Sequence, residues 1–270
     1  LQSKEEADAV VADLKKASYV VSEVKPRERQ RHPAAPFTTS TLQQEASRKL
    51  GFSARKTMRL AQQLYEGLDV GDEGTVGLIT YIRTDAVRIS EEAQAQAREY
   101  IAENYGKEYC PERPREYKSR QSAQGAHEAI RPTAVARTPE KVKPFLQRDQ
   151  YRLYRLIWER FVASQMASAI MDTLTVDIAA LLPGNAPVYN LRATGSKIKF
   201  PGFMILYVEQ QEQQTNESEE KILPDLAIHQ PLLLRGIAPE QHFTQPPPRY
   251  TEAMLVKTLE EKGIGRPSTY

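Results

Sequence analysis

The chain has 270 residues and a mass of 30.6 kDa, with 40% hydrophobic and 27% charged residues and a mean hydropathy of −0.57. This composition indicates a folded, water-soluble protein and excludes a collagen, a coiled-coil rod and a wholly disordered chain, and no apolar run approaches the ~18 residues of a membrane span. With a net charge of only +2 and a pI of about 8.5, any contact with nucleic acid must come from local basic clusters, such as KPRERQRH at residues 25–32. A single cysteine, Cys110, excludes an intrachain disulfide and a cysteine-based zinc site, and favours a reducing compartment.

The first 36 residues predict a helix, a strand and a linker. Apolar residues at helical spacing after a capping Ser3 predict a helix over residues 4–17, and an alternating β-branched run predicts a strand over residues 18–24. The basic stretch at residues 25–36 contains three prolines, so we interpret it as a linker.

The middle of the chain is predicted to be mainly helical. Helices are expected where apolar residues recur every three or four positions, at residues 39–50, 53–64, 90–105 and 148–169. The first two are separated by Gly51 and predict a helical hairpin. A glycine-rich segment then leads into a short strand at residues 78–82, and a polar, proline-containing loop is predicted at residues 110–124.

The last hundred residues change to a strand pattern before one final helix. Strands are expected at residues 174–182, 188–194, 203–208 and 232–237, with an acidic, glutamine-rich hairpin tip at residues 209–221 and a helix after Thr251. We therefore expect a multidomain α and β protein. A helical domain over residues 32–167 interrupts a β-rich domain formed by residues 1–31 and 168–238, and a further helical domain begins at residue 239.

Motifs for metal or nucleotide binding are absent from this sequence. His127 and Glu128 form an HE pair, but Arg131 stands where the HExxH zinc motif needs a second histidine. There is no P-loop, no GxGxxG after a strand and no Asp-x-Asp pair. We therefore expect no metal site within this chain.

The segment GLITYIRTD at residues 77–85 is the best candidate for a nucleophile. On a strand, residues i and i+2 face the same side, which would bring the Tyr81 hydroxyl and the Arg83 guanidinium together. A tyrosine hydroxyl is a poor nucleophile without assistance, and an arginine can bind a phosphate and stabilise the charge that develops on it. From spacing alone, a structural tyrosine beside a surface arginine is the simpler interpretation.

Five ordered motifs change that interpretation. They are PFTTSTLQQEASRKLGFSARKTMRLAQQLYEG, GLITYIRTDAVRIS, AHEAIRPT, LYRLIWERFVASQM and HFTQPPPRYTEAMLVKTLEEKGIGRPSTY, and together they span nearly the whole chain. Their order and content closely resemble bacterial DNA topoisomerase I, a type IA topoisomerase. Topoisomerase III and reverse gyrase share the tyrosine segment, so a fragment of either enzyme is the alternative within the same class.

The resemblance implies a role for each matching residue. Tyr81 would attack a DNA phosphodiester and become linked to the 5′-phosphate, and Arg83 would contact the scissile phosphate. His127 would contact DNA near the active site. Arg131 would be a second basic contact, with a salt bridge to an acidic neighbour as the alternative.

The C-terminal motif and two departures complete the comparison with the family. Arg266, Ser268 and Thr269 resemble a segment lining the single-strand groove, with a simple turn after the helix as the alternative. Ala86 stands where a serine is commonly seen, and Gly125 where an acidic residue is commonly seen.

The implied function is ATP-independent relaxation of negatively supercoiled DNA by cleavage of one strand, strand passage and religation. The β-rich flanks would form a hinged arch, and the helical block would be the gate that holds the nucleophile. Mg²⁺ would bind an N-terminal toprim domain that is absent here, so we expect a cytoplasmic, nucleoid-associated, monomeric central fragment that is inactive without the rest of its polypeptide. The alternative from another class is a non-catalytic arch protein that only binds DNA.

Overall fold

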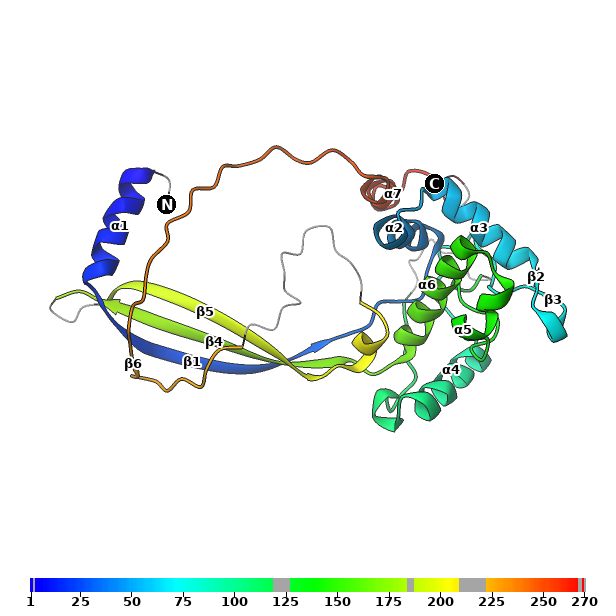
Figure 1. Ribbon diagram of the computed structural model, residues 1–270, viewed down its shortest axis with the longest axis horizontal. Coiled ribbons are helices and arrows are strands. Elements are labelled where there is room, and N and C mark those ends of the chain that lie inside the picture. Colours follow the sequence, from blue (N-terminus) through cyan, green and yellow to red (C-terminus); the bar gives the residue numbers. More distant parts are fainter. Residues whose placement is uncertain (2, 119–126, 184–186, 209–221, 267–268, 270) are drawn as a thin grey trace. The chain divides into compact units, whose positions relative to one another are not determined.

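The computed structural model describes residues 1, 3–118, 127–183, 187–208, 222–266 and 269 (Figure 1). Contacts divide the chain into two compact units. The sheet unit comprises Leu1–Arg31, Ile170–Phe200 and Gln214–Pro247, and the helical unit comprises His32–Ala169, Pro201–Gln213 and Pro248–Tyr270. Among the described residues, no helix is both long and apolar enough to cross a membrane.

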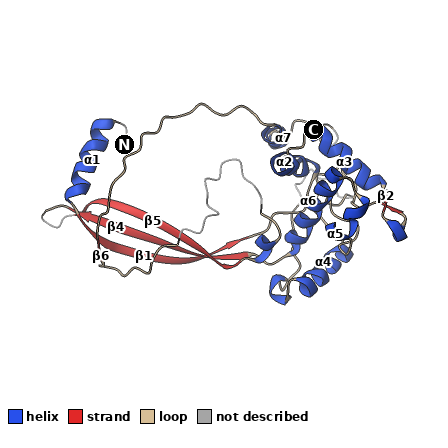
Figure 2. Ribbon diagram, viewed as in Figure 1, coloured by secondary structure: helices blue, strands red, loops and turns tan. Residues whose placement is uncertain are grey.

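The sheet unit consists of one helix and a four-stranded sheet (Figure 2). Helix α1 (Lys4–Lys16) begins after Ser3, whose side chain accepts a hydrogen bond from the Glu6 amide, as predicted. The strand order is β5-β4-β1-β6, with bounds β1 Ser18–Arg31, β4 Ala169–Leu181, β5 Pro187–Phe200 and β6 Pro231–Leu232. Strands β4 and β5 form a long antiparallel hairpin. Leu14, Tyr19 and Ala180 form a small core where α1 meets the sheet.

Strand β1 continues through the residues for which a linker was predicted. The prediction of a linker at residues 25–36 is wrong up to Arg31, although Pro26 lies within the strand. Strand β6 pairs with β1 at Tyr19 and Val20, and the turn before β6 bonds to Val21. Within the described residues, the edge of β1 beyond Val21 has no strand partner on that side. An open edge tolerates proline because no ladder hydrogen bond is lost there.

Two strands predicted after β5 are also corrected. None of residues 203–208 forms a strand, and the first three belong to a 3₁₀ turn, η4 (Gly202–Ile205). Gly202 has a φ of +49°, and the next amide donates to the Ala167 carbonyl at 3.0 Å, which folds the chain back at this point. The strand predicted at residues 232–237 is reduced to the two residues of β6. The hairpin tip predicted at residues 209–221 lies outside the described residues.

The helical unit contains most of the helices. Their bounds are α2 Thr39–Leu50, α3 Ala54–Glu66, α4 Glu91–Asn104, α5 Pro139–Val142, α6 Arg148–Gln165 and α7 Glu252–Glu261. A small hairpin of β2 (Leu68–Asp69) and β3 (Thr75–Val76) follows α3, and short 3₁₀ turns are η1 Gly71–Glu73, η2 Lys107–Tyr109 and η3 Lys143–Phe145. The helix predictions are confirmed to within a few residues.

Short polar residues fix where these helices begin. The side chains of Thr38, Ser53, Ser90 and Thr251 each accept a hydrogen bond from an amide of the following helical turn, which satisfies a donor that the helix itself cannot. Gly51 ends α2 in the left-handed conformation, with φ +68°, and the chain reverses into α3.

Helix α6 is the centre of the core. Its side chains Leu153, Tyr154, Ile157 and Phe161 are at most 2% exposed. They belong to one apolar cluster with residues of α2, α3 and α4, namely Leu42, Ala46, Leu60, Leu64, Ala97 and Ile101. The only tryptophan of the chain, Trp158, is 4% exposed and donates a hydrogen bond to the Val135 carbonyl.

Helix α7 packs against α2 and belongs by its contacts to the helical unit. The Glu260 carboxylate accepts a hydrogen bond from the Ser40 hydroxyl at 2.7 Å, and the Glu252 carboxylate accepts one from the Ala54 amide at 2.9 Å. The further domain expected from residue 239 stays a prediction, as do the arch and the gate.

Candidate active site

Three segments far apart in the sequence meet around Tyr81. Residues 36–39, 78–84 and 127–133 are joined by backbone hydrogen bonds, in which the amides of Ile130, Thr80 and Thr133 donate to the carbonyls of Phe37, Arg131 and Leu78 at 2.8–3.0 Å. The strand predicted at residues 78–82 is wrong, because pairing is limited to isolated bridges, Ile79 with Pro132 and Phe37 with Ile130. Pro132 has no amide hydrogen and therefore interrupts any longer ladder.

Buried threonines hold the backbone on both sides of Arg83. The Thr39 hydroxyl donates to the Ile82 carbonyl at 2.7 Å and accepts from the Thr84 amide at 2.9 Å. The Thr39 amide in turn donates to the Thr84 carbonyl at 2.9 Å. Thr39 and Thr84 are 0% and 1% exposed, so these bonds are shielded from water. Position 83 is therefore fixed to the start of α2.

Exposure alternates along this segment. Ile82 is 1% exposed and Thr84 is buried, whereas Tyr81 is 43% exposed and Arg83 is exposed. The two side chains that the sequence singled out therefore both lie at the surface, while the residue between them is anchored in the core. An exposed phenol and an exposed guanidinium two residues apart can approach the same polyanion.

The Tyr81 ring contacts two other rings. Its centroid is 5.5 Å from that of Tyr65 at the end of α3 and 5.6 Å from that of His127, and both contacts are edge-to-face. The structure thus brings His127 beside Tyr81. Tyr65 was missed by sequence reasoning, since one tyrosine among 13 gives no signal by composition, although it lies inside the first recognised motif.

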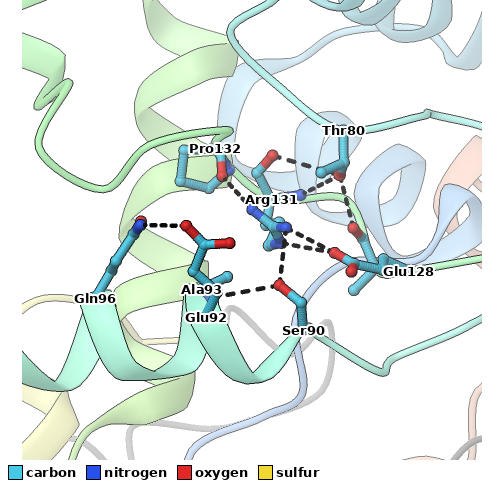
Figure 3. Close-up of polar contacts among 9 residues, drawn as sticks. Thr80, Ser90, Glu92, Ala93, Gln96, Glu128, Arg131 and Pro132 are labelled. Carbon is cyan, nitrogen blue, oxygen red and sulfur yellow. Dashed lines mark hydrogen bonds and ion pairs between the residues drawn. The ribbon is translucent and has the colours of Figure 1, made fainter.

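The Arg131 guanidinium is hydrogen-bonded to neighbouring protein groups (Figure 3). Its Nε and Nη2 donate to one carboxylate oxygen of Glu128 at 2.9 and 2.7 Å, Nη1 donates to the Pro132 carbonyl, and Nη2 donates to the Ser90 hydroxyl at 3.4 Å. Its side chain is only 12% exposed. The pair with Glu128 is the salt bridge to an acidic neighbour that the sequence analysis gave as the alternative for Arg131. The bond to Ser90 joins the segment after His127 to the start of α4.

The C-terminal candidates form a turn after α7. The Thr269 hydroxyl accepts from the Arg266 amide at 2.8 Å, and the Thr269 amide donates to the Arg266 carbonyl at 2.8 Å. Ser268 lies outside the described residues. Within the described residues, no hydrogen bond or ring contact joins Arg266 or Thr269 to Tyr81.

Of the two residues that depart from the family pattern, the structure describes Ala86 but not Gly125. Ala86 is 3% exposed, and its amide donates to the Thr84 hydroxyl at 3.0 Å, so a methyl group fills a buried position there. Gly125 lies outside the described residues.

The described residues contain no cluster of three or more histidine, cysteine, aspartate or glutamate side chains that could hold a metal ion. Cys110, a free and partly buried thiol, packs against the apolar core. Among the described residues, no such group is available to a Mg²⁺ ion, and no chemical step is assigned to a metal.

Comparison with known proteins identifies the family of this chain. A family model described as DNA topoisomerase matches residues 1–270. The full-length topoisomerase I of Thermotoga maritima is similar in structure, with a TM-score of 0.74 and 37% sequence identity over 100% of this chain. The match covers 41% of that protein's chain. With a match to the family model over its entire length, this chain belongs to the bacterial type IA DNA topoisomerase family.

Proposed function

We propose that this chain supplies the nucleophile and strand-holding part of an ATP-independent DNA topoisomerase, an isomerase that relaxes negatively supercoiled DNA. The observation that carries the proposal is Tyr81, exposed and in ring contact with His127 on a backbone fixed by buried hydrogen bonds. A nucleophile needs access to its substrate and a fixed position, and this tyrosine combines the two.

In the proposed cleavage step, the Tyr81 hydroxyl oxygen attacks the phosphorus of a phosphodiester. A bond forms between this oxygen and phosphorus, and the bond from phosphorus to the 3′ oxygen breaks. The phenol loses its proton, the departing 3′ oxygen gains one, and the downstream strand stays attached as a 5′-phosphotyrosine. Religation is the reverse reaction, and because the ester conserves the energy of the broken bond, no nucleotide hydrolysis is required.

The neighbouring side chains have distinct roles in this proposal. Arg83, exposed two residues along, contacts the non-bridging oxygens and stabilises the charge that builds up on them. His127, at the edge of the Tyr81 ring, contacts the DNA strand. Arg131, bonded to Glu128 and Ser90, holds the His127 segment against α4. Arg266, Ser268 and Thr269 belong to the start of the single-strand groove.

The chain spans 41% of the Thermotoga protein, so the activity of the whole enzyme involves more than these residues. We propose that Mg²⁺ and the acid and base groups belong to a toprim domain of the same polypeptide, and that this chain alone does not cleave DNA. Its substrates would be single-stranded and negatively supercoiled DNA in the cytoplasm, and the enzyme would act as a monomer.

A complementation assay tests the proposal. The chain is mixed with a separately produced toprim-bearing piece, Mg²⁺ and single-stranded DNA labelled at its 3′ end, and the label that stays on the chain after denaturation is measured. We expect a covalent adduct with the wild-type chain, none with Tyr81→Phe, and an undiminished adduct with Tyr250→Phe, a matched change at a 64% exposed tyrosine. Absence of any adduct while the two pieces associate would favour a protein that only binds DNA.

A further inference from the structure

The second half of β1 has a basic residue at every second position. Lys25, Arg27, Arg29 and Arg31 alternate with Pro26, Glu28 and Gln30. Successive side chains of a strand point to opposite faces, so the four cations share one face, about 6.7 Å apart along the strand. We call Arg27, Arg29 and Arg31 the arginine row.

Ion pairs show that the two faces of this strand differ. Glu28, on the face opposite the arginine row, pairs with Lys199 of β5 at 2.7 Å. On the face of the row, Lys25 lies 3.9 Å from Asp177, and Asp177 also pairs with Arg192 at 2.6 Å. Lys25 also pairs with Glu23, which lies on the same face two positions earlier in β1. Both of these carboxylates are thus already paired with a cation, and both lie at the Lys25 end of the row.

The guanidinium groups of the arginine row are accessible to an external anion. Arg27 and Arg29 are exposed and Arg31 is half-buried. Within the described part of the chain, none of their guanidinium groups has an ion pair or a hydrogen bond to a protein acceptor. Three unpaired guanidinium groups at regular spacing repel one another, and a polyanion of matching repeat relieves that repulsion.

The neighbouring strands indicate which polyanion fits. The Thr173 hydroxyl of β4 donates to the Arg27 carbonyl at 2.9 Å, which places this part of β4 beside the row. The adjacent residues, 171–175 of β4 and their β5 partners 194–198, include threonine and serine but no aromatic side chain. Proteins that hold single strands stack bases on aromatic rings, whereas a duplex presents only phosphates and sugars to such a surface.

We propose that the arginine row is a second DNA-contact surface, which binds the phosphate backbone of duplex DNA without sequence preference. The choice of DNA as the polyanion rests on the proposed function, but the row lies in the sheet unit and the proposed nucleophile lies in the helical unit. The row requires no covalent chemistry. Each arginine neutralises a phosphate and releases counterions, so its contribution is salt-dependent.

The test compares two matched double variants of the full chain. Arg27→Gln/Arg29→Gln removes two charges from the row, and Lys197→Gln/Lys199→Gln removes two exposed charges from the opposite face of the sheet. Both changes are at exposed positions, and circular dichroism checks that each variant keeps its fold. Binding of a fluorescent 20-base-pair duplex, and of one of its strands, is followed by anisotropy between 50 and 200 mM salt.

We expect the loss of two phosphate contacts to lower the slope of log K against log salt by about 1.8 for the row variant. Over this fourfold range of salt, the wild-type affinity should therefore fall about 12-fold more than that of the row variant. The lysine variant should keep the wild-type slope. Equal losses in both variants, an unchanged slope in the row variant, no duplex binding by the wild type, or a loss confined to the single strand would each overturn the proposal.

The adduct assay separates this proposal from the proposed function. If the row variant loses duplex binding and Tyr81→Phe still forms an adduct, the proposed nucleophile is wrong and the row stands. If the adduct depends on Tyr81 while duplex binding is unchanged in the Arg27→Gln/Arg29→Gln variant, the proposed nucleophile stands and the proposal for the arginine row is wrong.

Discussion

The hydroxyl of Thr39 joins the start of α2 to the segment that contains Tyr81 and Arg83, and replacing Thr39 by valine tests how that segment is held. Valine has nearly the same shape, so packing is preserved while the hydroxyl is lost. The Ile82 carbonyl and the Thr84 amide then lose their partners in a region where Thr39 is 0% exposed. Water cannot replace them without opening the core.

The magnitude follows from these two groups. A buried polar group left without a partner costs about 1–3 kcal/mol, so two such groups predict a loss of about 2–6 kcal/mol in the free energy of unfolding. With an m-value of about 2 kcal/mol/M, the urea midpoint should fall by about 1–3 M. Fluorescence of Trp158, the only tryptophan, reports this transition because it is buried in the core of the helical unit.

Two further variants make the result specific. Thr39→Ser keeps the hydroxyl and should restore most of the lost stability. Thr194→Val changes an exposed threonine of the sheet unit and should leave the Trp158 transition unchanged. If Thr39→Val unfolds within about 0.5 kcal/mol of the wild type, the size expected for a neutral surface change, the reasoning about the site's backbone is refuted.

Two other predictions concern the same unit. Gly202→Ala should lower the free energy of unfolding by at least about 2 kcal/mol, because φ is +49° and a new Cβ would lie 2.6 Å from the backbone oxygens of residues 167–168. Gly51→Ala, with open space around the new Cβ, should lower it by only about 1 kcal/mol. Urea titrations measure the free energy of unfolding of both variants. Burial raises the pKa of Tyr117 to about 12, so stability should hold below about pH 10, where an unfolded tyrosine begins to ionise, and fall between about pH 10 and 12. The Trp158 midpoint at pH 9 and 11 measures this loss, which should be smaller in Tyr117→Phe.

Local sequence signals predicted the helices well. The starts of α1, α4 and α7 follow from Ser3, Ser90 and Thr251, because a capping side chain and the helix it begins are neighbours in the sequence. The exposure of Tyr81 and Arg83 likewise agrees with a local argument, since Ile82 between them is the one that is buried.

Local signals did not predict contacts between residues that are far apart in the sequence. The prolines that indicated a linker do not prevent a strand when one edge of β1 is open, and the open edge is visible only once the strand order is known. Likewise, a short strand predicted around Tyr81 is replaced by single bridges to two distant segments, which no local pattern encodes. Tyr65 is 16 positions from Tyr81, and the contact between their rings depends on the fold of the β2–β3 hairpin that separates them.

The way Tyr81 is held has a consequence for how it could move. Thr39 lies in the first turn of α2 and Tyr65 near the end of α3, so the two ends of one helical hairpin fix the Tyr81 segment and touch the Tyr81 ring. Both helices also pack on α6 through a continuous apolar core. Bending Tyr81 away from this hairpin would expose the buried Thr39 and Thr84 bonds, at a cost of a few kcal/mol. If a gate opens during strand passage, the tyrosine and its hairpin should therefore move together as one rigid body, and the flexible points should lie outside α2, α3 and α6.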